Sequence, residues 1–459
     1  MLVNITSVMK KSFLFAAVAV LALGACTKVD SYTEVAPEAL TFGAYSPRVQ
    51  TKAGATIDMN LKNLATEGFG VFATYSGTAD FTAASDDFMY NQQVTSADEG
   101  ATWTYAPIKY WPNPTDGSAA NNQKLSFFAY APYCEPGTAE TVGITGFEID
   151  ATTKHDIVKY AFKSNVPNVD LMWGYKKDWN GTSTVDAERV NLNLTRTTEK
   201  VGFKFRHTLA KLAGSQEGDP GTDGSNANGF VILAAPTLDP TNGFGTATGT
   251  KVTVTKITVK SADTDLNGDP ISYAADDETQ EATLDLYTGK LTLPTTVKNM
   301  KFSQTIAANP NTANGENELA DDLKEVANPA NFGAVNKGVT KVPVNVYKNE
   351  VNPIILIPGT APCVEVEITY VVRTYDAKLD QNGDKHFSEV PQTVYKKIQF
   401  PTIEENRKYN LRAILGLMDV KFEASVEDWT LGFNDANGNG VQDPGEDTYE
   451  NNVYLPQNL

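Results

Sequence analysis

The sequence predicts a mainly β protein, and its pattern favours a sandwich or a barrel over a parallel sheet with helical crossovers. From residue 69 onward, short segments rich in aromatic and β-branched residues alternate with Gly, Pro, Asn and Asp. Several later segments alternate apolar and polar residues with a period of two, as KVTVTKITVK at 251–260 does. The roughly 430 residues that follow residue 25 are enough for two domains, or for three small ones.

Strands are expected along both halves of the chain. A first short strand is expected at Leu40–Tyr45, and a hairpin is expected at 282–293 with Thr288 and Gly289 at its turn. Only 299–327 has the character of a weak helix. The other expected strands of the first half are FGVFATYSG (69–77), TWTYAPIKYW (102–111), KLSFFAYAPY (124–133), ITGFEID (144–150) and VDLMWGY (169–175). Those of the second half are VPVNVY (342–347), NPIILIPG (352–359), VEVEITYVVRTY (364–375), TVYKKIQF (393–400), YNLRAILGL (409–417) and VKFEASVEDW (420–429).

Residues 1–25 are expected to be a lipoprotein signal peptide. Two lysines precede an apolar run, Phe13–Leu23, that ends in small residues, which is the layout of a secretory signal. The run has about half the length that a membrane-spanning helix needs. The residues LGA at 23–25 suit a peptidase that cuts before a cysteine, so Cys26 is the expected lipidated N-terminus. The alternative is an ordinary signal followed by an incidental cysteine.

Composition excludes several classes of partner and cofactor. The chain has 56 acidic and 38 basic residues, and its net charge of -18 would repel nucleic acid and anionic lipid headgroups. Besides Cys26 the cysteines are Cys134 and Cys363, each in an apolar stretch, and two buried free thiols are expected rather than a disulfide. The three histidines are scattered singly, so no zinc site is expected.

A twelve-residue stretch near the C-terminus, DANGNGVQDPGE at 435–446, has the spacing of a calcium-binding loop. Gly440 would allow the sharp turn of such a loop, while Pro444 and Gly445 would break an exit helix, so a paired EF-hand is not expected. The alternative is an Asn- and Gly-rich turn that holds no metal. The expected calcium ligands are Asp435, Asn437, Asn439, the carbonyl of Val441, Asp443 and Glu446.

Two further patterns concern ligand binding and catalysis. Trp103, Tyr105, Tyr110 and Trp111 could stack on sugar rings, but aromatic residues that alternate along a strand belong more often to a core. The sequence has no H-E-x-x-H, G-x-S-x-G or phosphate-binding loop, so the chain is not expected to be an enzyme.

Four segments carry a family resemblance through their order and spacing: WTYAPIKYWP (103–112), KLSFFAYAPY (124–133), FKFRHTLAKL (203–212) and ENRKYNLRAILGLMDVKFEASVEDW (405–429). Together with the signal before Cys26, they resemble the fimbrillin family, the lipoprotein subunits of the type V pili of Bacteroidales. The resemblance implies two transthyretin-like β-sandwich domains in tandem. The pattern of segments places the boundary between them near residue 205, which gives domains at 49–205 and 206–430. It leaves open whether the chain is a major, tip or accessory subunit.

The resemblance also implies an assembly route. An Arg-specific surface protease would remove the pro-segment 26–48 with its first strand, and Arg48 matches the processing position. The alternative is that Arg48 is an ordinary solvated arginine. The vacated slot would accept a strand from a neighbouring subunit, because an incoming strand satisfies both the unpaired backbone and the apolar slot. The tail 431–459 offers a short donor pattern in Tyr449, Val453 and Leu455, interrupted by Pro456.

The expected function is therefore that of a structural pilus subunit that contributes to adhesion. The precursor would be anchored in the outer membrane through lipid and then incorporated into the cell-surface fimbrium. Its partners would be other pilus subunits and the Arg-specific protease, with no role for nucleic acid. The alternative function is a permanently lipid-anchored surface protein that binds glycans or host ligands.

Overall fold

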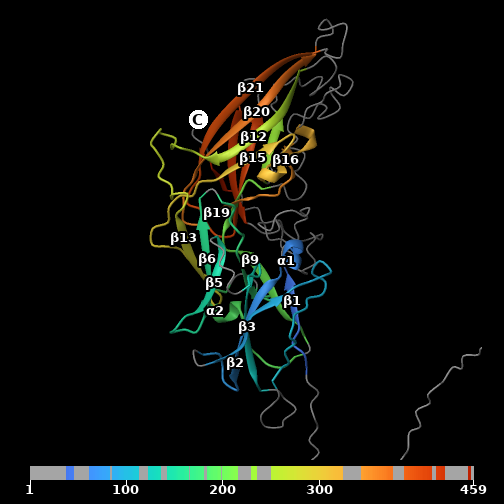
Figure 1. Ribbon diagram of the computed structural model, residues 1–459, viewed down its shortest axis with the longest axis vertical. Helices are drawn as coiled ribbons and strands as arrows, with labels where there is room; N and C mark the ends of the chain where they lie inside the picture. The colour runs from blue at the N-terminus through green and yellow to red at the C-terminus, as the bar shows by residue number, and fades with distance from the viewer. Residues whose placement is uncertain are drawn as a thin grey trace, which may run out of the picture. The chain divides into compact units, whose positions relative to one another are not determined.

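A computed structural model describes residues 38–45, 61–82, 85–112, 122–135, 142–164, 166–179, 183–197, 199–214, 229–234, 250–323, 343–375, 387–415, 420–428 and 453–455. All of them lie in one compact unit, Pro37–Leu459. The described chain is mainly β, as the sequence predicted, and its strands form four sheets (Figure 1). Helical structure is limited to α1 (Leu61–Glu67), α2 (Asp186–Arg189) and the 3-10 turns η1 (Thr312–Asn314) and η2 (Asp321–Leu323) in these residues.

Two of the sheets are built mainly from the first half of the chain. Sheet I has the order β1 (Phe42–Tyr45), β9 (Val201–His207), β7 (Met172–Lys176), β4 (Lys124–Ala131), β2 (Phe69–Gly77) and β3 (Asp86–Val94), with β8 (Asn191–Leu194) also pairing with β4. Sheet II has the order β14 (Leu291–Thr292), β13 (Thr279–Asp285), β6 (Asp156–Lys163) and β5 (Gly143–Ile149).

The other two sheets come from the second half. Sheet III has the order β17 (Pro343–Asn345), β11 (Phe230–Ala234), β22 (Arg407–Leu415), β10 (Ala210–Leu212) and β19 (Ile354–Leu356), and β23 (Val420–Asp428) joins β22 to β24 (Val453–Leu455). Sheet IV has the order β18 (Tyr347–Asn349), β16 (Asn317–Leu319), β15 (Ser303–Ala307), β12 (Thr250–Ser261), β20 (Cys363–Tyr375) and β21 (Phe387–Gln399).

Side-chain burial shows how the sheets pack in pairs. One core cluster contains residues of sheets I and II, such as Phe128 and Tyr160, and another contains residues of sheets III and IV, such as Leu411 and Val366. Sheet I is buried on its second face as well, where Phe127 belongs to a further cluster. A strand buried on both faces has no polar side to show in its sequence. This explains why FGVFATYSG and KLSFFAYA are apolar almost throughout rather than alternating.

The predicted hairpin is confirmed, but the sequence does not indicate which other strand it pairs with. Strands β13 and β14 pair with each other, and Gly289 in their turn has a positive φ of 67°. Strand β13 then pairs along its whole length with β6, from Thr279 opposite Lys163 to Asp285 opposite Ile157 (Figure 1). Sheet II is therefore completed by residues that lie more than a hundred positions later in the chain, so the two halves interlock. The division into domains at residue 205 stays a prediction.

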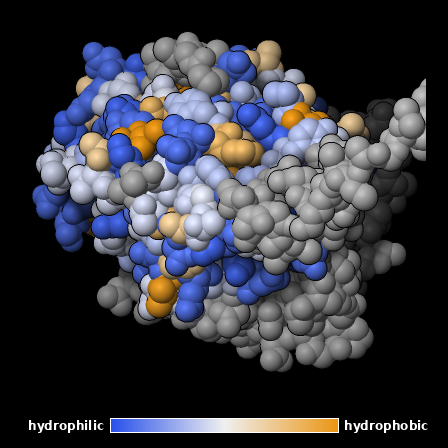
Figure 2. All heavy atoms as spheres, turned by 90° about the horizontal axis from the view of Figure 1, so that it is seen from below, coloured by the Kyte–Doolittle hydropathy of each residue, from blue (hydrophilic) through white to orange (hydrophobic). Residues whose placement is uncertain are grey.

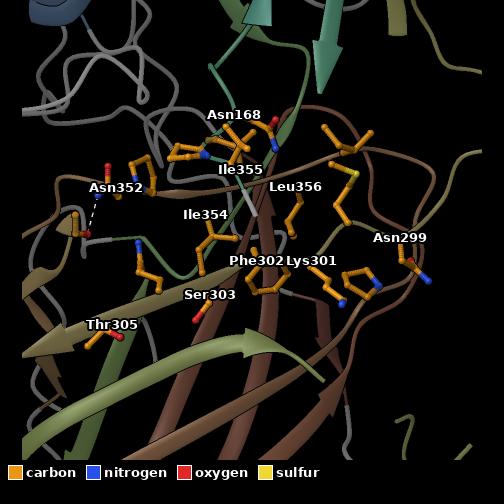
Figure 3. A pocket seen from close by; sticks show the side chains of 18 of the residues that line it. Asn168, Asn299, Lys301, Phe302, Ser303, Thr305, Asn352, Ile354, Ile355 and Leu356 are labelled. Atoms are coloured by element: carbon orange, nitrogen blue, oxygen red, sulfur yellow. Dashed lines mark hydrogen bonds between the residues drawn. The ribbon is translucent and has the colours of Figure 1, made fainter. Parts of the chain in front are cut away.

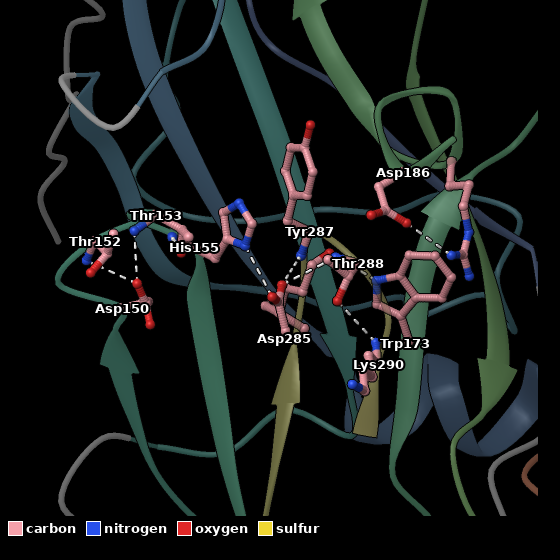
Figure 4. Close-up of polar contacts among 12 residues, drawn as sticks. Asp150, Thr152, Thr153, His155, Trp173, Asp186, Asp285, Tyr287, Thr288 and Lys290 are labelled. Atoms are coloured by element: carbon pink, nitrogen blue, oxygen red, sulfur yellow. Dashed lines mark hydrogen bonds and ion pairs between the residues drawn. The ribbon is translucent and has the colours of Figure 1, made fainter. Parts of the chain in front are cut away.

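The turn of this hairpin is held by one carboxylate (Figure 4). Asp285 accepts hydrogen bonds from the backbone N–H groups of Tyr287 and Thr288, at 2.8 and 3.1 Å. Its other oxygen lies 2.9 Å from Nδ1 of His155, and the His155 ring stacks on Tyr287 with the ring centroids 4.3 Å apart. The hairpin is thus fastened to the start of β6 by polar contacts as well as by its backbone.

The prediction of a weak helix at 299–327 is wrong for the residues that the structure describes. Strands β15 and β16 occupy 303–307 and 317–319, and only the two short 3-10 turns are helical there. In β15 the buried residues are Gln304 and Ile306, which is the period of a strand. Pairing with β12 decides the conformation here, and that pairing is not visible in the local sequence.

Surface features complete the description. On the face that Figure 2 shows, hydrophobic residues form small separate spots among hydrophilic ones. None of the helices in the described ranges is long and apolar enough to span a membrane. Neither Cys134 nor Cys363 forms a disulfide, as predicted, but only Cys363 is fully buried and Cys134 is partly exposed. Burial raises the pKa of the Cys363 thiol.

Candidate functional site

The first strand, β1, sits at the edge of sheet I, where backbone pairing and buried side chains both hold it. It pairs in parallel with β9, with Phe42 opposite Val201 and Ala44 opposite Phe203. The alternate residues Leu40, Phe42 and Ala44 are only 1, 1 and 5% exposed. The short strand predicted at Leu40–Tyr45 is therefore present, and its apolar residues fill a slot in the core.

Hydrogen bonds clamp the residues before β1 on the side away from β9. The Leu40 N–H donates to the carbonyl of Lys109 at 2.9 Å, and the Trp111 N–H donates to the carbonyl of Glu38, also at 2.9 Å. The Tyr105 hydroxyl donates to the carbonyl of Leu40 at 3.0 Å. Burial raises the pKa of Tyr105, so its hydroxyl keeps the proton that it donates. The segment therefore runs between β9 and the loop that contains Lys109.

Aromatic rings form the walls of this slot. Phe42 lies against Tyr105, Phe127 and Phe203, with ring centroids 5.1, 6.0 and 6.4 Å apart. The slot is therefore shaped by large rigid groups around one central ring, an arrangement that favours edge contacts between aromatic pairs.

The four aromatic residues considered as a sugar-stacking face do not form one exposed surface. Trp103, Tyr105 and Trp111 are buried in the same core as Phe42, and only Tyr110 is exposed, at 50%. The interpretation as core, which the sequence left open, is therefore the right one for three of the four. The strand expected at 102–111 is wrong, because this segment is a loop with only isolated bridges, and it folds over sheet I and covers the first strand.

Comparison with known proteins identifies the family. The model of the fimbrillin-like family matches residues 62–429. This chain belongs to the fimbrillin-like family. Fimbrium subunit Fim1C of Phocaeicola vulgatus is 25% identical over 219 residues, which are 45% of this chain and 51% of that protein. The chain thus spans about half the length of this curated relative.

Solved structures with lower identity are also similar to this fimbrillin-like chain. A fimbrial protein from Bacteroides vulgatus is 17% identical, with 85% of this chain and 99% of that chain covered and a TM-score of 0.47. A candidate cell adhesion protein from Bacteroides uniformis is 16% identical, with 86 and 98% covered and a TM-score of 0.35. The family assignment rests on the match to the family model.

Several predicted sites of this fimbrillin-like chain lie outside the described residues. They are the lipidation site Cys26, the processing site Arg48 and the calcium loop 435–446 with Asp435, Asn437, Asn439, Val441, Asp443 and Glu446. Among the residues that the structure does describe, no three acidic, histidine or cysteine side chains are placed to hold a metal ion. These sites stay predictions.

The C-terminal tail contributes one short strand to its own subunit. Strand β24 pairs antiparallel with β23, with Val453 opposite Val426 and Leu455 opposite Ala424. In this arrangement the candidate donor residues Val453 and Leu455 pair within sheet III, while the third, Tyr449, lies outside the described residues.

The sequence did not single out Tyr105 as a clamp on the first strand. Its hydrogen bond joins it to Leu40, 65 residues earlier, and no local pattern reports so distant a pairing. The useful signal was the aromatic-rich loop itself, because a loop with that many rings must cover apolar surface.

Proposed function

We propose that this chain is a structural subunit of a cell-surface fimbrium, made as a lipoprotein precursor with Cys26 as the lipid anchor. An Arg-specific protease cuts after Arg48, β1 leaves with the lipidated segment, and a strand from a neighbouring subunit takes its place. The observation that supports this most is the short edge strand β1, whose apolar side chains fill an aromatic slot. The family assignment supports the fimbrial role.

The energetics favour exchange over simple loss of the strand. Full burial of a Leu or Phe side chain stabilises a protein by about 1.5–3 kcal/mol, so departure of Leu40 and Phe42 would remove that stabilisation and leave the apolar walls of the slot uncovered. The backbone of β9 would also lose its parallel partner. A donor strand restores both the buried apolar contacts and the backbone pairing with β9 if it presents apolar side chains at alternate positions.

The C-terminal tail meets part of this requirement. Val453 and Leu455 lie two residues apart, which matches the spacing of Leu40 and Phe42. Pro456 follows at once and removes a backbone donor. Donation also requires β24 to detach from β23, so tail release is a step of the proposed assembly.

The test is treatment of the purified protein with an Arg-specific protease, followed by mass spectrometry and electrophoresis in SDS without heating. Cleavage after Arg48 and growth of SDS-resistant multimers are expected. Arg48→Lys keeps the charge but removes the cleavage site, so it should stay monomeric, while Lys52→Gln changes a neighbouring basic residue without altering any arginine and should be cleaved and assemble as the unmodified protein does. A cleaved protein that remains a stable monomer would overturn assembly through the β1 slot.

Failure of cleavage at Arg48 would favour the permanently lipid-anchored alternative, in which the first strand is never released. A variant with Val453→Asp and Leu455→Asp tests the donor separately. It should be cleaved normally and fail to form multimers, because a carboxylate cannot enter the aromatic slot without a large desolvation cost.

A further inference from the structure

The slot that holds β1 has two backbone edges, and the segment uses them in turn. An even-numbered residue bonds to the loop, where the Leu40 N–H donates to the carbonyl of Lys109 at 2.9 Å. The odd-numbered residues face β9, since the Val201 N–H donates to the carbonyl of Thr41 at 2.8 Å. Every second residue of a strand bonds to the same neighbour, so Gly43 also turns its N–H toward β9. A strand that replaces β1 therefore needs an N–H at the positions of Leu40 and Gly43.

These contacts also fix the direction of the strand. Strand β9 pairs with β1 in parallel, whereas Tyr110 of the loop forms an antiparallel bridge with Ala39. The Tyr105 hydroxyl donates to the carbonyl of Leu40 at 3.0 Å and accepts the Lys109 N–H at 3.2 Å, so it joins the segment to the loop. A strand inserted in the opposite direction reverses the sense of both pairings, and its carbonyl groups meet the loop at different positions.

Three side-chain positions along the slot differ in size. Leu40 is a buried aliphatic residue, and Phe42 is the ring at the centre of the aromatic walls. Ala44 is buried opposite Phe203, so a longer side chain there would have to displace its neighbours. A smaller residue in place of Phe42 would instead leave a cavity. The slot is therefore matched to a large aliphatic residue, a ring and a small residue at alternate positions.

We propose that the β1 slot selects the incoming strand by this pattern, with the strand running parallel to β9. The proposal rests on the strand exchange proposed above and names the kind of strand that the exchange favours. The chain's own tail matches the pattern only in part. In the spacing given above, Leu455 takes the place of Phe42, and Pro456 takes the place of Gly43, where an N–H is needed. A neighbouring subunit that offers a ring at the central position is the better donor.

A different open strand edge lies beside the cavity of about 380 Å³ that Figure 3 shows. Strand β16 pairs only with the last two residues of β15, so among the described residues 303–305 have a sheet neighbour on one side only. Ser303, Thr305 and Asn352 bring polar groups to the cavity wall, so a peptide that paired here would not need a ring between a large and a small residue. This edge therefore serves as the control for where a peptide binds.

The first test keeps the precursor intact, so it does not depend on cleavage. Phe42→Leu and Ala44→Leu should each lower the urea midpoint of unfolding, because the first variant leaves space in the slot and the second overfills it. Thr41→Ser is the matched control, since Thr41 is exposed between the two positions and should unfold as the unmodified protein does. An unchanged midpoint in Phe42→Leu or in Ala44→Leu would overturn the selection by size.

The second test measures selection by the full chain that carries Val453→Asp and Leu455→Asp, so that its own tail does not compete. After treatment with the Arg-specific protease, the protein is titrated into a fluorescent peptide of residues 38–45, and binding is followed by anisotropy. Peptides with Phe42→Leu, Ala44→Leu or Gly43→Pro should each bind about tenfold or more weakly, which corresponds to about 1.4 kcal/mol. The peptide with Thr41→Ser should bind as the parent does.

Cross-linking tests the place and direction of binding. Tyr45 lies opposite Lys204 in the parallel pairing, so a peptide with Tyr45→Cys should form a disulfide with the Lys204→Cys protein under mild oxidation. A peptide with Glu38→Cys, at the other end, should not. Neither peptide should cross-link to a Ser303→Cys protein, in which the cysteine marks the edge of β15. Mass spectrometry locates each cross-link, and a cross-link from Glu38→Cys to Lys204→Cys, or from either peptide to Ser303→Cys, would overturn the proposal.

The outcomes separate this proposal from the proposed function. Failure of cleavage after Arg48 would overturn the processing step, while the midpoints of the intact precursor would still decide whether the slot selects by size. Normal cleavage and multimer formation with equal binding of all the peptides would overturn the selection and leave strand exchange standing.

Discussion

Strands β1 and β21 both end a sheet, but different interactions hold them there. Strand β1 has four residues, and its alternate side chains are buried in an aromatic core. Strand β21 has thirteen residues that pair with β20 along its whole length, while Tyr395 on it is 71% exposed. Strand β1 thus combines a four-residue ladder with fully buried side chains, whereas β21 combines a thirteen-residue ladder with an outward face that is exposed.

The difference extends to protection of the edges. Strand β21 carries Pro391, Lys396 and Lys397, residue types that discourage pairing with another chain at an open edge. The Phe42–Tyr45 segment carries none of these residue types, and its neighbour on one side is a loop rather than a strand. The long edge thus carries residues that discourage pairing with another chain and the short edge carries none, which is consistent with the strand exchange proposed above.

The largest effect is expected for Phe42→Ala, which removes the central ring of the β1 slot. Loss of a buried Phe side chain costs about 3–5 kcal/mol, so the free energy of unfolding should fall by that amount in urea denaturation. Cleavage after Arg48 should also become faster, because the strand is held less firmly. A loss below about 1 kcal/mol would mean that the backbone pairing with β9, not the side chain, holds β1.

The two halves of the chain also differ in how they accommodate buried carboxylates. In the second half, Glu350 is buried against Lys211, with 3.2 Å between Oε2 and Nζ. In the first half, Asp156 at the start of β6 is 6% exposed, and its Oδ2 has no partner among the described residues. Burial, together with the charges of Asp87 and Asp285, raises the pKa of Asp156 to about 7.

Asp156→Asn should therefore stabilise the protein at high pH. An aspartate in the unfolded chain has a pKa of about 4, so the folded state holds this proton more tightly, and the stability that it contributes is lost as the pH rises toward 7. The variant should exceed the unmodified protein by about 2–4 kcal/mol at pH 8 and match it near pH 4. Urea denaturation across this range measures the difference.

Asp150 supplies the control for that experiment. It is exposed, and hydrogen bonds from Thr153 and Thr152 lower its pKa, so Asp150→Asn should give no gain at pH 8. Parallel stability curves for Asp156→Asn and the unmodified protein would show that the carboxylate of Asp156 is solvated after all.

Local sequence patterns predict the positions of most strands, but they do not predict which distant segments contact one another. The segments at 69–77, 124–133 and 282–293 were recognisable because their composition and turn residues act within a few positions. The sequence did not reveal two long-range contacts, the pairing of β13 with β6 and the hydrogen bond from Tyr105 to Leu40. Each of these contacts joins residues far apart in the chain.

The smallest effect is expected for Tyr395→Ala, which tests the other side of the comparison. Its side chain is exposed on β21, and the residue stays opposite Glu367 through the backbone ladder alone. Surface substitutions of this kind usually change the free energy of unfolding by no more than about 0.5 kcal/mol. A loss above about 1.5 kcal/mol in urea denaturation would show that the Tyr395 side chain helps to hold β21 in place. Truncation of an exposed ring without such a role changes the free energy of unfolding only slightly. The contrast between an exchangeable and a permanent edge would then have to rest on strand length alone.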